Sequence, residues 1–178
     1  ILVCLVGSEM CIRDSIYNSN IDDVEIYYEA DEEFNTYSYK SKSNKYIILV
    51  SSKTISDEIR YIDADNPLGI LRLFQERIDK LEYSVNHRNN KWYIQTNTEN
   101  SKNFKLMICN EGKTSLQNWR EFIRHRENVL LESVEVFNDY LVITERENGQ
   151  RRFNVFTNDN NYYIAVSYTH LRAHETHE

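Results

Sequence analysis

A short motif recurs three times along the chain and limits the folds that the chain can adopt. It places an asparagine, a charged residue and an aromatic residue before a run of β-prone residues, and its copies begin at Asn44, Asn90 and Asn138. The copies are 46 and 48 residues apart. After each aromatic residue, the next apolar run follows at a nearly constant distance of 13, 12 and 13 residues. A repeat of this length predicts one supersecondary unit stacked on the next.

Each repeat contains four candidate strands, which are short runs of β-branched and aromatic residues separated by Asn, Asp, Ser and Lys. The clearest candidates are residues 24–28, 46–52, 58–63, 92–97, 104–109, 140–145 and 152–156, with first strands at 34–39, 82–87 and 130–137 and fourth strands at 71–75, 118–123 and 161–165. Four strands in about fifty residues are the sequence mark of a β-propeller blade.

We therefore predict an all-β, partial β-propeller of about three four-stranded antiparallel blades, at residues 34–76, 82–123 and 131–165. Residues 16–33 are interpreted as the end of an earlier blade. The weakest strand prediction concerns residues 116–128, where four apolar residues also fit one face of a helix: Leu116, Trp119, Phe122 and Ile123. The place of this stretch in the repeat favours a strand.

Both ends of the chain are encoded by one DNA string read in opposite directions. Residues 5–15 back-translate to CTC GTG GGC TCG GAG ATG TGT ATA AGA GAC AGx, and the reverse complement translates to VSYTHLRAHE, which is residues 166–175. The string resembles a sequencing-library adapter, so we interpret residues 1–15 and 166–178 as non-native tails and residues 16–165 as an internal propeller segment. We expect the tails to be poorly ordered or to pair opportunistically with blade edges.

The tails also account for the apparent metal site. His170, His174 and His177 have helical spacing, but all three lie in the rear tail. Without them no Cys/His cluster remains, so we expect neither a metal nor another cofactor. The tails hold two arginines and four acidic residues, so the net charge of −7 becomes −5 for residues 16–165. This mildly acidic segment has no basic stripe, and we expect neither nucleic acid nor a membrane as partner.

Several further residues are interpreted as structural. The aromatic residues of the repeat, Tyr46, Trp92 and Tyr140, are expected to occupy one equivalent blade position and to serve packing. Cys109 lies in an apolar run and is interpreted as a small core residue rather than a reactive thiol. The acidic residues 31–33 have no partner groups for acid–base chemistry and are expected in a solvated turn.

The order and spacing of four longer stretches carry a family resemblance. They are VEIYYEADEEFNTYSYKSKSNKYIILVSSKTISDEIRYIDADNP (24–67), EYSVNHRNNKWYIQTN (82–97), NSKNFKLM (100–107) and HRENVLLESVEVFNDYLVITERENG (125–149). Together they resemble the N-terminal propeller of the oligopeptidase B family, also called protease II, in the prolyl oligopeptidase group of serine peptidases. The resemblance covers nearly all of residues 22–156.

This resemblance implies a two-domain cytoplasmic enzyme, in which a seven-bladed propeller caps an α/β-hydrolase domain that cleaves short peptides after Arg or Lys. The nucleophile elbow of that domain, G-x-S-x-G, does not occur in this chain, whose four glycines are too far apart. The catalytic Ser, Asp and His therefore belong to a part that this chain lacks, and we expect it to be inactive. Its role would be to admit short peptides and exclude folded proteins. Exposed blade edges would permit self-association.

The resemblance also implies that innermost strands line a central tunnel, which directs attention to residues 82–87 and 127–137. His87 faces the tunnel or the domain interface, or it is a hydrogen-bonded structural residue, which is the commoner role of a lone histidine at a strand end. His125, Arg126 and Glu127 form a charged corner before an inner strand. They either make salt bridges to the hydrolase domain or form a solvated turn, whose ion pairs are worth about 0 to 1 kcal/mol.

A second function class remains open on the residues alone. A free-standing propeller can act as a protein-interaction scaffold, as kelch and WD40 repeats do. This chain lacks the paired glycines of kelch units and the Trp-Asp ending of WD40 blades, which lowers this alternative. A hydrolase segment carrying G-x-S-x-G in the same gene would distinguish the enzyme from the scaffold.

Overall fold

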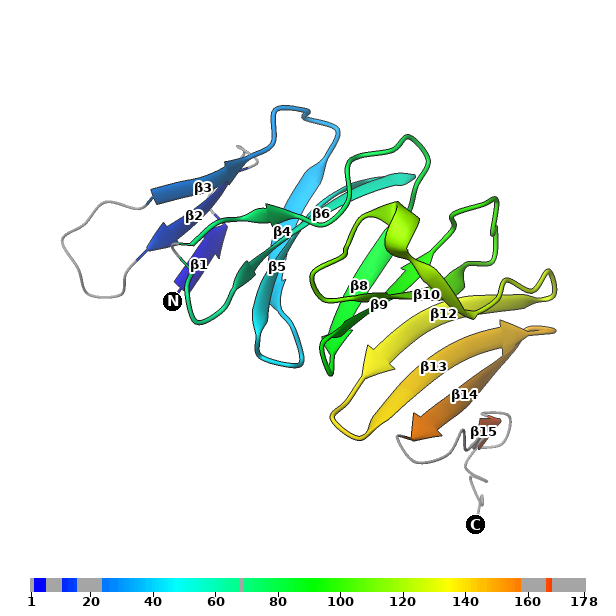
Figure 1. Cartoon of the computed structure of the whole chain (residues 1–178). Helices are drawn as coiled ribbons and strands as arrows, with labels where there is room; N and C mark the ends of the chain where they lie inside the picture. The colour runs from blue at the N-terminus through cyan, green and yellow to red at the C-terminus, as the bar shows by residue number, and fades with distance from the viewer. Residues whose placement is uncertain (1, 6–10, 16–23, 68, 158–165, 168–178) are drawn as a thin grey trace, which may run out of the picture.

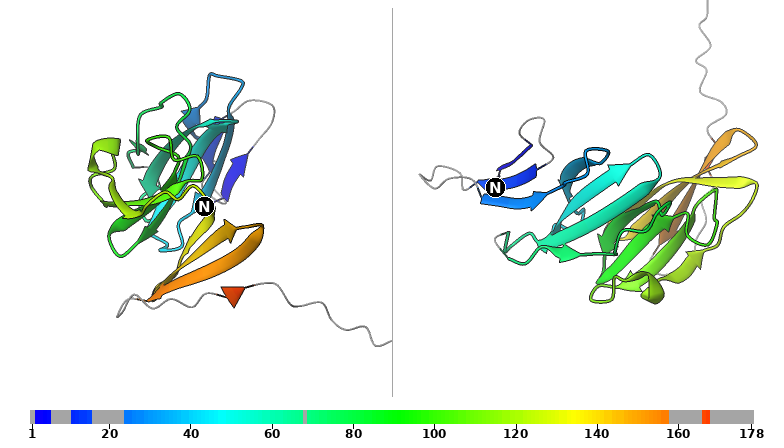
Figure 2. Two further views of the ribbon diagram at one scale, coloured as in Figure 1. Left: turned by 90° about the vertical axis from the view of Figure 1, so that its right-hand side faces the viewer. Right: turned by 90° about the horizontal axis from the view of Figure 1, so that it is seen from above.

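The computed structural model describes residues 2–5, 11–15, 24–67, 69–157 and 166–167, and it describes side chains from residue 26 to residue 157 apart from residue 68. Four antiparallel sheets follow one another in chain order (Figures 1 and 2). Each sheet packs against its neighbours in the row. The predicted partial propeller is thereby confirmed.

The strands of each sheet are consecutive in the sequence. The first sheet contains β1 (Leu2–Leu5), β2 (Cys11–Ser15) and β3 (Val24–Tyr28). The first blade contains β4 (Asn35–Lys40), β5 (Tyr46–Lys53), β6 (Ser56–Asp63) and β7 (Arg72–Leu73). The second blade contains β8 (Tyr83–Arg88), β9 (Lys91–Thr96), β10 (Lys105–Asn110) and β11 (Arg120–Ile123). The third blade contains β12 (Val129–Val136), β13 (Tyr140–Glu147), β14 (Gln150–Thr157) and β15 (Val166–Ser167).

The stretch with the ambiguous periodicity forms the predicted strand. Only Leu116–Asn118 is helical, as one 3₁₀ turn (η1), and β11 then pairs with β10. Trp119, between the two elements, is 6% exposed and its ring lies 5.4 Å from that of Tyr83. Burying this ring against the second blade fixes the chain at that point, and the helical alternative is wrong.

The first and second blades enclose the larger hydrophobic cluster. The first blade contributes Tyr46, Ile48, Val50, Ile59, Tyr61 and Phe74, and the second contributes Val85, Trp92, Ile94, Met107, Cys109 and Trp119 with Leu81 and Tyr83. Trp92 is at its centre, with no exposed surface. A smaller cluster joins the second and third blades through Leu106, Leu131, Val134, Val136, Leu141 and Ile143. Burial between sheets, rather than within one, therefore holds the row together.

The three aromatic residues of the repeat do not all occupy one equivalent position. Tyr46 and Trp92 face each other across the interface of the first two blades, with ring centroids 5.0 Å apart. Tyr46 therefore lies on the side of its blade that faces forward along the row, and Trp92 on the side that faces back. Tyr140 belongs to neither cluster and is 40% exposed, whereas Leu141 beside it is buried. Because side chains alternate along a strand, a shift of one residue in register reverses the face, and the prediction of one shared packing position is wrong.

Asparagine takes the tight turns that glycine often occupies. The hairpin from β8 to β9 turns at Asn89 and Asn90, whose φ angles are 49° and 59°. The hairpin from β13 to β14 turns at Asn148 and Gly149, with φ angles of 50° and 77°. Positive φ at both central residues gives a two-residue turn whose twist matches that of the strands. Asparagine tolerates this conformation better than other side chains do.

The parts of both tails that the structure describes pair with strand edges. β2 pairs with β3, and β15 pairs with Arg152 and Phe153 of β14. β15 occupies the fourth place of the third blade, while the strand predicted at residues 161–165 lies outside the described residues. Across the described ranges, no helix is long and apolar enough to span a membrane.

Candidate functional site

The first strands of the three blades lie next to one another. The Tyr39 hydroxyl of β4 donates to the Val85 carbonyl of β8 at 3.1 Å, and the Asn86 amide of β8 donates to the Val134 carbonyl of β12 at 3.1 Å. The hairpins that follow these strands lie at the same ends of the three blades and consequently meet there. They enclose a pocket of about 190 Å³, lined by Lys42, Ser43, His87, Arg88, Asn89, Val136, Phe137 and Asn138.

His87 forms part of the wall of this pocket and is 3% exposed. Its Nδ1 atom lies 2.8 Å from the Ser43 hydroxyl oxygen, and its ring meets those of Tyr46 and Trp92 edge-on at 4.9 and 4.8 Å. Burial lowers the pKa of His87 and outweighs the nearby Glu111 carboxylate, so the imidazole is neutral at pH 7. The structure therefore places His87 in the interface between the first two blades, beside the pocket.

Glu111 joins the first and second blades next to His87. It accepts a hydrogen bond from the Tyr46 hydroxyl, and its Oε1 lies 2.5 Å from Lys45 Nζ. Burial alone would raise the pKa of Glu111, but the hydrogen bonds from Lys45 and Tyr46 lower it, so the carboxylate is ionised at neutral pH. The His87 Nε2 atom is 3.3 Å from Glu111 Oε1, yet the geometry is not that of a hydrogen bond.

This arrangement places Ser43, His87 and Glu111 in the order of nucleophile, base and acid, but it lacks the hydrogen bond between the imidazole and the carboxylate. In a working triad the carboxylate accepts a hydrogen bond from the imidazole and fixes its tautomer. Here Glu111 is held by Lys45 and Tyr46 instead, and the base is almost fully buried. We therefore assign the cluster to packing between blades and not to catalysis.

A second contact, beside the pocket, joins the first blade to the third. Lys42, in the loop between β4 and β5, forms an ion pair with Glu135 of β12. The same ammonium lies 4.6 Å from the centre of the Phe137 ring. We call Lys42, Glu135 and Phe137 the inner latch. Both charged side chains are nearly half exposed, so the pair is weak and can open.

The charged corner at residues 125–127 is tied to its own domain. His125 Nε2 accepts a hydrogen bond from the Asn103 backbone N–H at 3.3 Å, and the Asn103 amide donates to the carbonyls of Arg126 and Glu127 at 3.3 and 2.6 Å. Arg126 also pairs with Glu145. The corner precedes β12, whereas His87 stands near the end of β8, so the structure does not bring the two candidate sites together. Their proposed contact with a hydrolase domain stays a prediction.

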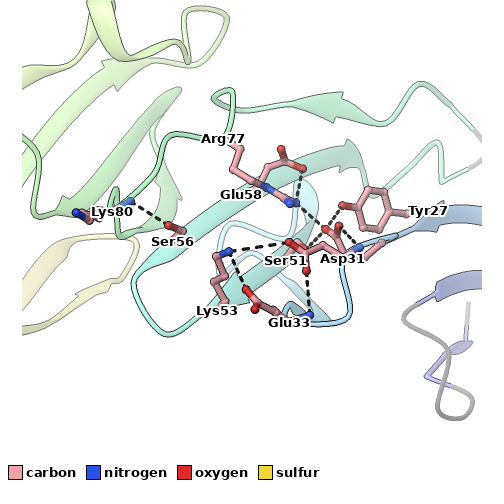
Figure 3. A network of polar contacts seen from close by, with 10 residues as sticks. Tyr27, Asp31, Glu33, Ser51, Lys53, Ser56, Glu58, Arg77 and Lys80 are labelled. Carbon is pink, nitrogen blue, oxygen red and sulfur yellow. Dashed lines mark hydrogen bonds and ion pairs between the residues drawn. The ribbon is translucent and has the colours of Figure 1, made fainter.

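A polar network that the sequence did not reveal lies where β3 leads into the first blade (Figure 3). Arg77 Nη2 lies 2.6 Å from Glu29 Oε2 and 3.4 Å from Glu58 Oε1. Glu29 also accepts hydrogen bonds from the hydroxyls of Tyr27 and Ser51. Burial raises the pKa of Glu29, but these hydrogen bonds outweigh it and lower the pKa to about 2. No spacing in the sequence links these residues, because their contacts depend on the fold.

The remaining candidates behave as structural residues. Burial raises the pKa of the Cys109 thiol to about 12, so it is not a nucleophile at neutral pH. The acidic residues 31–33 form a turn, in which the Glu33 N–H donates to Asp31 Oδ1 at 3.0 Å. In the described ranges, no group of three or more His, Cys, Asp or Glu side chains is placed to hold a metal ion.

Comparison with known proteins agrees with the fold. Residues 12–175 match the family described as prolyl oligopeptidase, N-terminal beta-propeller domain. The chain is 36% identical to Protease 2 of Moraxella lacunata over 124 residues, which are 70% of this chain and 18% of that protein. It is 30% identical to dipeptidyl aminopeptidase BI of Pseudoxanthomonas mexicana over 137 residues, which are 77% of this chain and 19% of that protein. The chain thus spans about a fifth of the length of these relatives.

Solved structures have the same fold. Oligopeptidase B of Leishmania major matches 88% of this chain and 23% of its own, with a TM-score of 0.77 and 21% identity. Oligopeptidase B of Trypanosoma brucei, in its closed form with covalently bound antipain, matches 90% of this chain and 24% of its own, with a TM-score of 0.78 and 20% identity. The row of blades and the match over residues 12–175 lead to one conclusion: this chain belongs to the family of prolyl oligopeptidase N-terminal β-propeller domains.

Proposed function

We propose that this chain is the non-catalytic propeller part of a serine oligopeptidase that cleaves short peptides after Arg or Lys, and that it restricts which substrates reach the active site. The family match over residues 12–175 carries the proposal. The preference for basic residues rests on the likeness to oligopeptidase B and Protease 2. The matched segment makes up only 18 to 19% of these relatives, and this favours the peptidase over a free-standing scaffold.

The inner latch supplies a physical means of restriction. The first strands of the blades form the innermost row, and the loop carrying Lys42 reaches from the first blade to Glu135 of the third. While this pair is closed, the hairpins that follow the first strands of the three blades stay together. An exposed ion pair is worth about 0 to 1 kcal/mol. The latch therefore favours the closed arrangement of the hairpins slightly, and the hairpins can still separate to let a peptide pass.

The specificity part of the proposal is tested on a full-length protein that carries this segment with its hydrolase domain. A ladder of unstructured peptides, each with one Arg, one Lys or neither, is digested, and products are identified by mass. We expect cleavage only after Arg or Lys, and falling rates as the peptides lengthen. Cleavage after other residues would contradict the specificity, and equal rates for short peptides and folded proteins would contradict restriction by size.

The latch part is tested with Lys42→Gln and Glu135→Gln in the same protein. We expect kcat/KM for the longest peptides to rise relative to that for an arginyl dipeptide amide, by up to about fivefold, because an exposed ion pair is lost. Lys102→Gln is the control, since Lys102 is exposed and does not line the pocket. An unchanged length dependence in both latch variants would exclude the latch as part of the gate.

A further inference from the structure

Three cationic side chains of the second blade line one pocket of about 280 Å³. Lys91 is the first residue of β9, Arg120 is the first residue of β11, and Lys113 lies in the loop between β10 and β11. The sheet register brings them together, because Lys91 pairs with Asn110 of β10 and Arg120 pairs with Ile108 of the same strand. The lining comes entirely from the second blade.

These cations have no anionic partner in the part of the chain that the structure describes. Ten other Lys and Arg side chains there lie within 4.0 Å of a carboxylate, and the carboxylates include Glu132 and Glu145. Lys91, Lys113 and Arg120 make no such contact, and no acidic residue lines their pocket. In a chain with a net charge of −7, three uncompensated positive charges at one pocket form a local field of the opposite sign.

The rest of the pocket suits an oxyanion. The amide side chains of Asn110, Gln117 and Asn118 add neutral hydrogen-bond donors to the lining. The lining also includes Ile108 and Cys109, and burial keeps the Cys109 thiol protonated, so these two residues add no negative charge. Arg120 supplies a planar fork that can bind two oxygens of one group, while the lysines act as point charges.

We propose that this pocket of the second blade binds a multiply charged oxyanion, with a phosphate group as the best match. A single carboxylate carries one negative charge and would balance only part of the three positive charges. A phosphate dianion balances more of the charge and accepts hydrogen bonds from several sides. The site requires neither the inner latch nor a hydrolase domain, so it is independent of the function proposed above. A phosphorylated small molecule and free phosphate share this chemistry.

The test is calorimetric titration of the intact chain with inorganic phosphate at pH 7.5, with ionic strength held constant by chloride. We expect saturable binding of phosphate, weaker binding of acetate and none attributable to chloride. Lys113→Gln and Arg120→Gln should each weaken phosphate binding by about fivefold, as expected for loss of one exposed charged contact. Lys102→Gln, which removes an exposed lysine outside the pocket, should leave the affinity unchanged.

A second readout protects the test against variants that fail to fold. In the unmodified chain, phosphate should shift the backbone amide NMR signals of residues 113 and 117–120 before those of other segments. Replacing inorganic phosphate by a sugar phosphate distinguishes the two sources, and either one binding at this pocket supports the proposal. Binding that is equal for phosphate, acetate and chloride, shifts centred elsewhere, or equal losses in Lys102→Gln and Lys113→Gln would overturn it.

Discussion

The sequence around Glu29 suggests an exposed carboxylate, but the fold buries this side chain and pairs its charge. It precedes an acidic, exposed turn, and nothing in the local pattern distinguishes it from the carboxylates of that turn. In the folded chain its side chain is only 6% exposed, and its charge is balanced by Arg77, which also lies 3.8 Å from the centre of the Phe34 ring. Removing either partner would leave a buried charge without compensation.

The pKa of Glu29 predicts a specific pH dependence of stability. The pKa is about 2 in the folded chain and 4.5 for an unperturbed glutamate, so the stabilisation is fully present above about pH 4.5 and is lost as the pH falls toward 2. In the wild-type chain, protonation of Glu29 should lower the free energy of unfolding by on the order of 3 kcal/mol across the full window. We expect Glu29→Gln to lack this decrease. Urea unfolding from pH 2 to pH 6 measures it. Glu33→Gln, at an exposed carboxylate, is the control, and parallel curves for wild type and Glu29→Gln would contradict the assignment.

Local patterns indicated the structural residues of the site but not its charged contacts. The apolar run around Cys109 predicted its burial, and a lone histidine at the end of a strand predicted a structural role for His87. By contrast, Lys91, Lys113 and Arg120 are spread over thirty positions of the sequence, and Lys42 is 93 residues from Glu135. Such contacts depend on how strands pair and blades stack, which the spacing of residues does not encode.

At the scale of elements, the existence of strands could be predicted well and the face that each residue presents could not. Runs such as YIILVSS and YLVITE are β-branched and form β5 and β13 as expected. Which side chains point forward depends on register, and register changes with the length of each hairpin. The hairpin before Trp92 has a two-residue turn, whereas four residues separate Ser41 from Tyr46.

This difference in face predicts unequal costs for truncating two aromatic residues of the repeat. Trp92→Ala should lower the free energy of unfolding by about 3 to 5 kcal/mol, because a fully buried ring is lost from the interface of two blades. Tyr140→Ala should cost about 1 kcal/mol, since its ring is partly exposed and contacts mainly Phe137. Equilibrium urea denaturation measures both. Similar costs would mean that the two residues do occupy one packing position.

At the scale of the whole molecule, stability rests on blades that contact their neighbours in the row. One cluster joins the first two blades and another joins the second to the third, so the stability of each blade depends on its neighbours. The described residues bring together packing contacts, an inner latch and a cationic pocket. The role that we propose for this domain is to limit access to a catalytic centre located elsewhere in the protein.

The most direct test compares hydrolysis of an arginyl amide by this chain alone and by a full-length protein that contains it. We predict no hydrolysis above the buffer rate by the chain alone, because the residues that the structure describes supply no oriented nucleophile and base, and rapid hydrolysis by the full-length protein. Hydrolysis by the chain alone that disappears in Ser43→Ala would contradict the account. It would mean that the Ser43, His87 and Glu111 cluster, assigned here to packing, is itself a catalytic site.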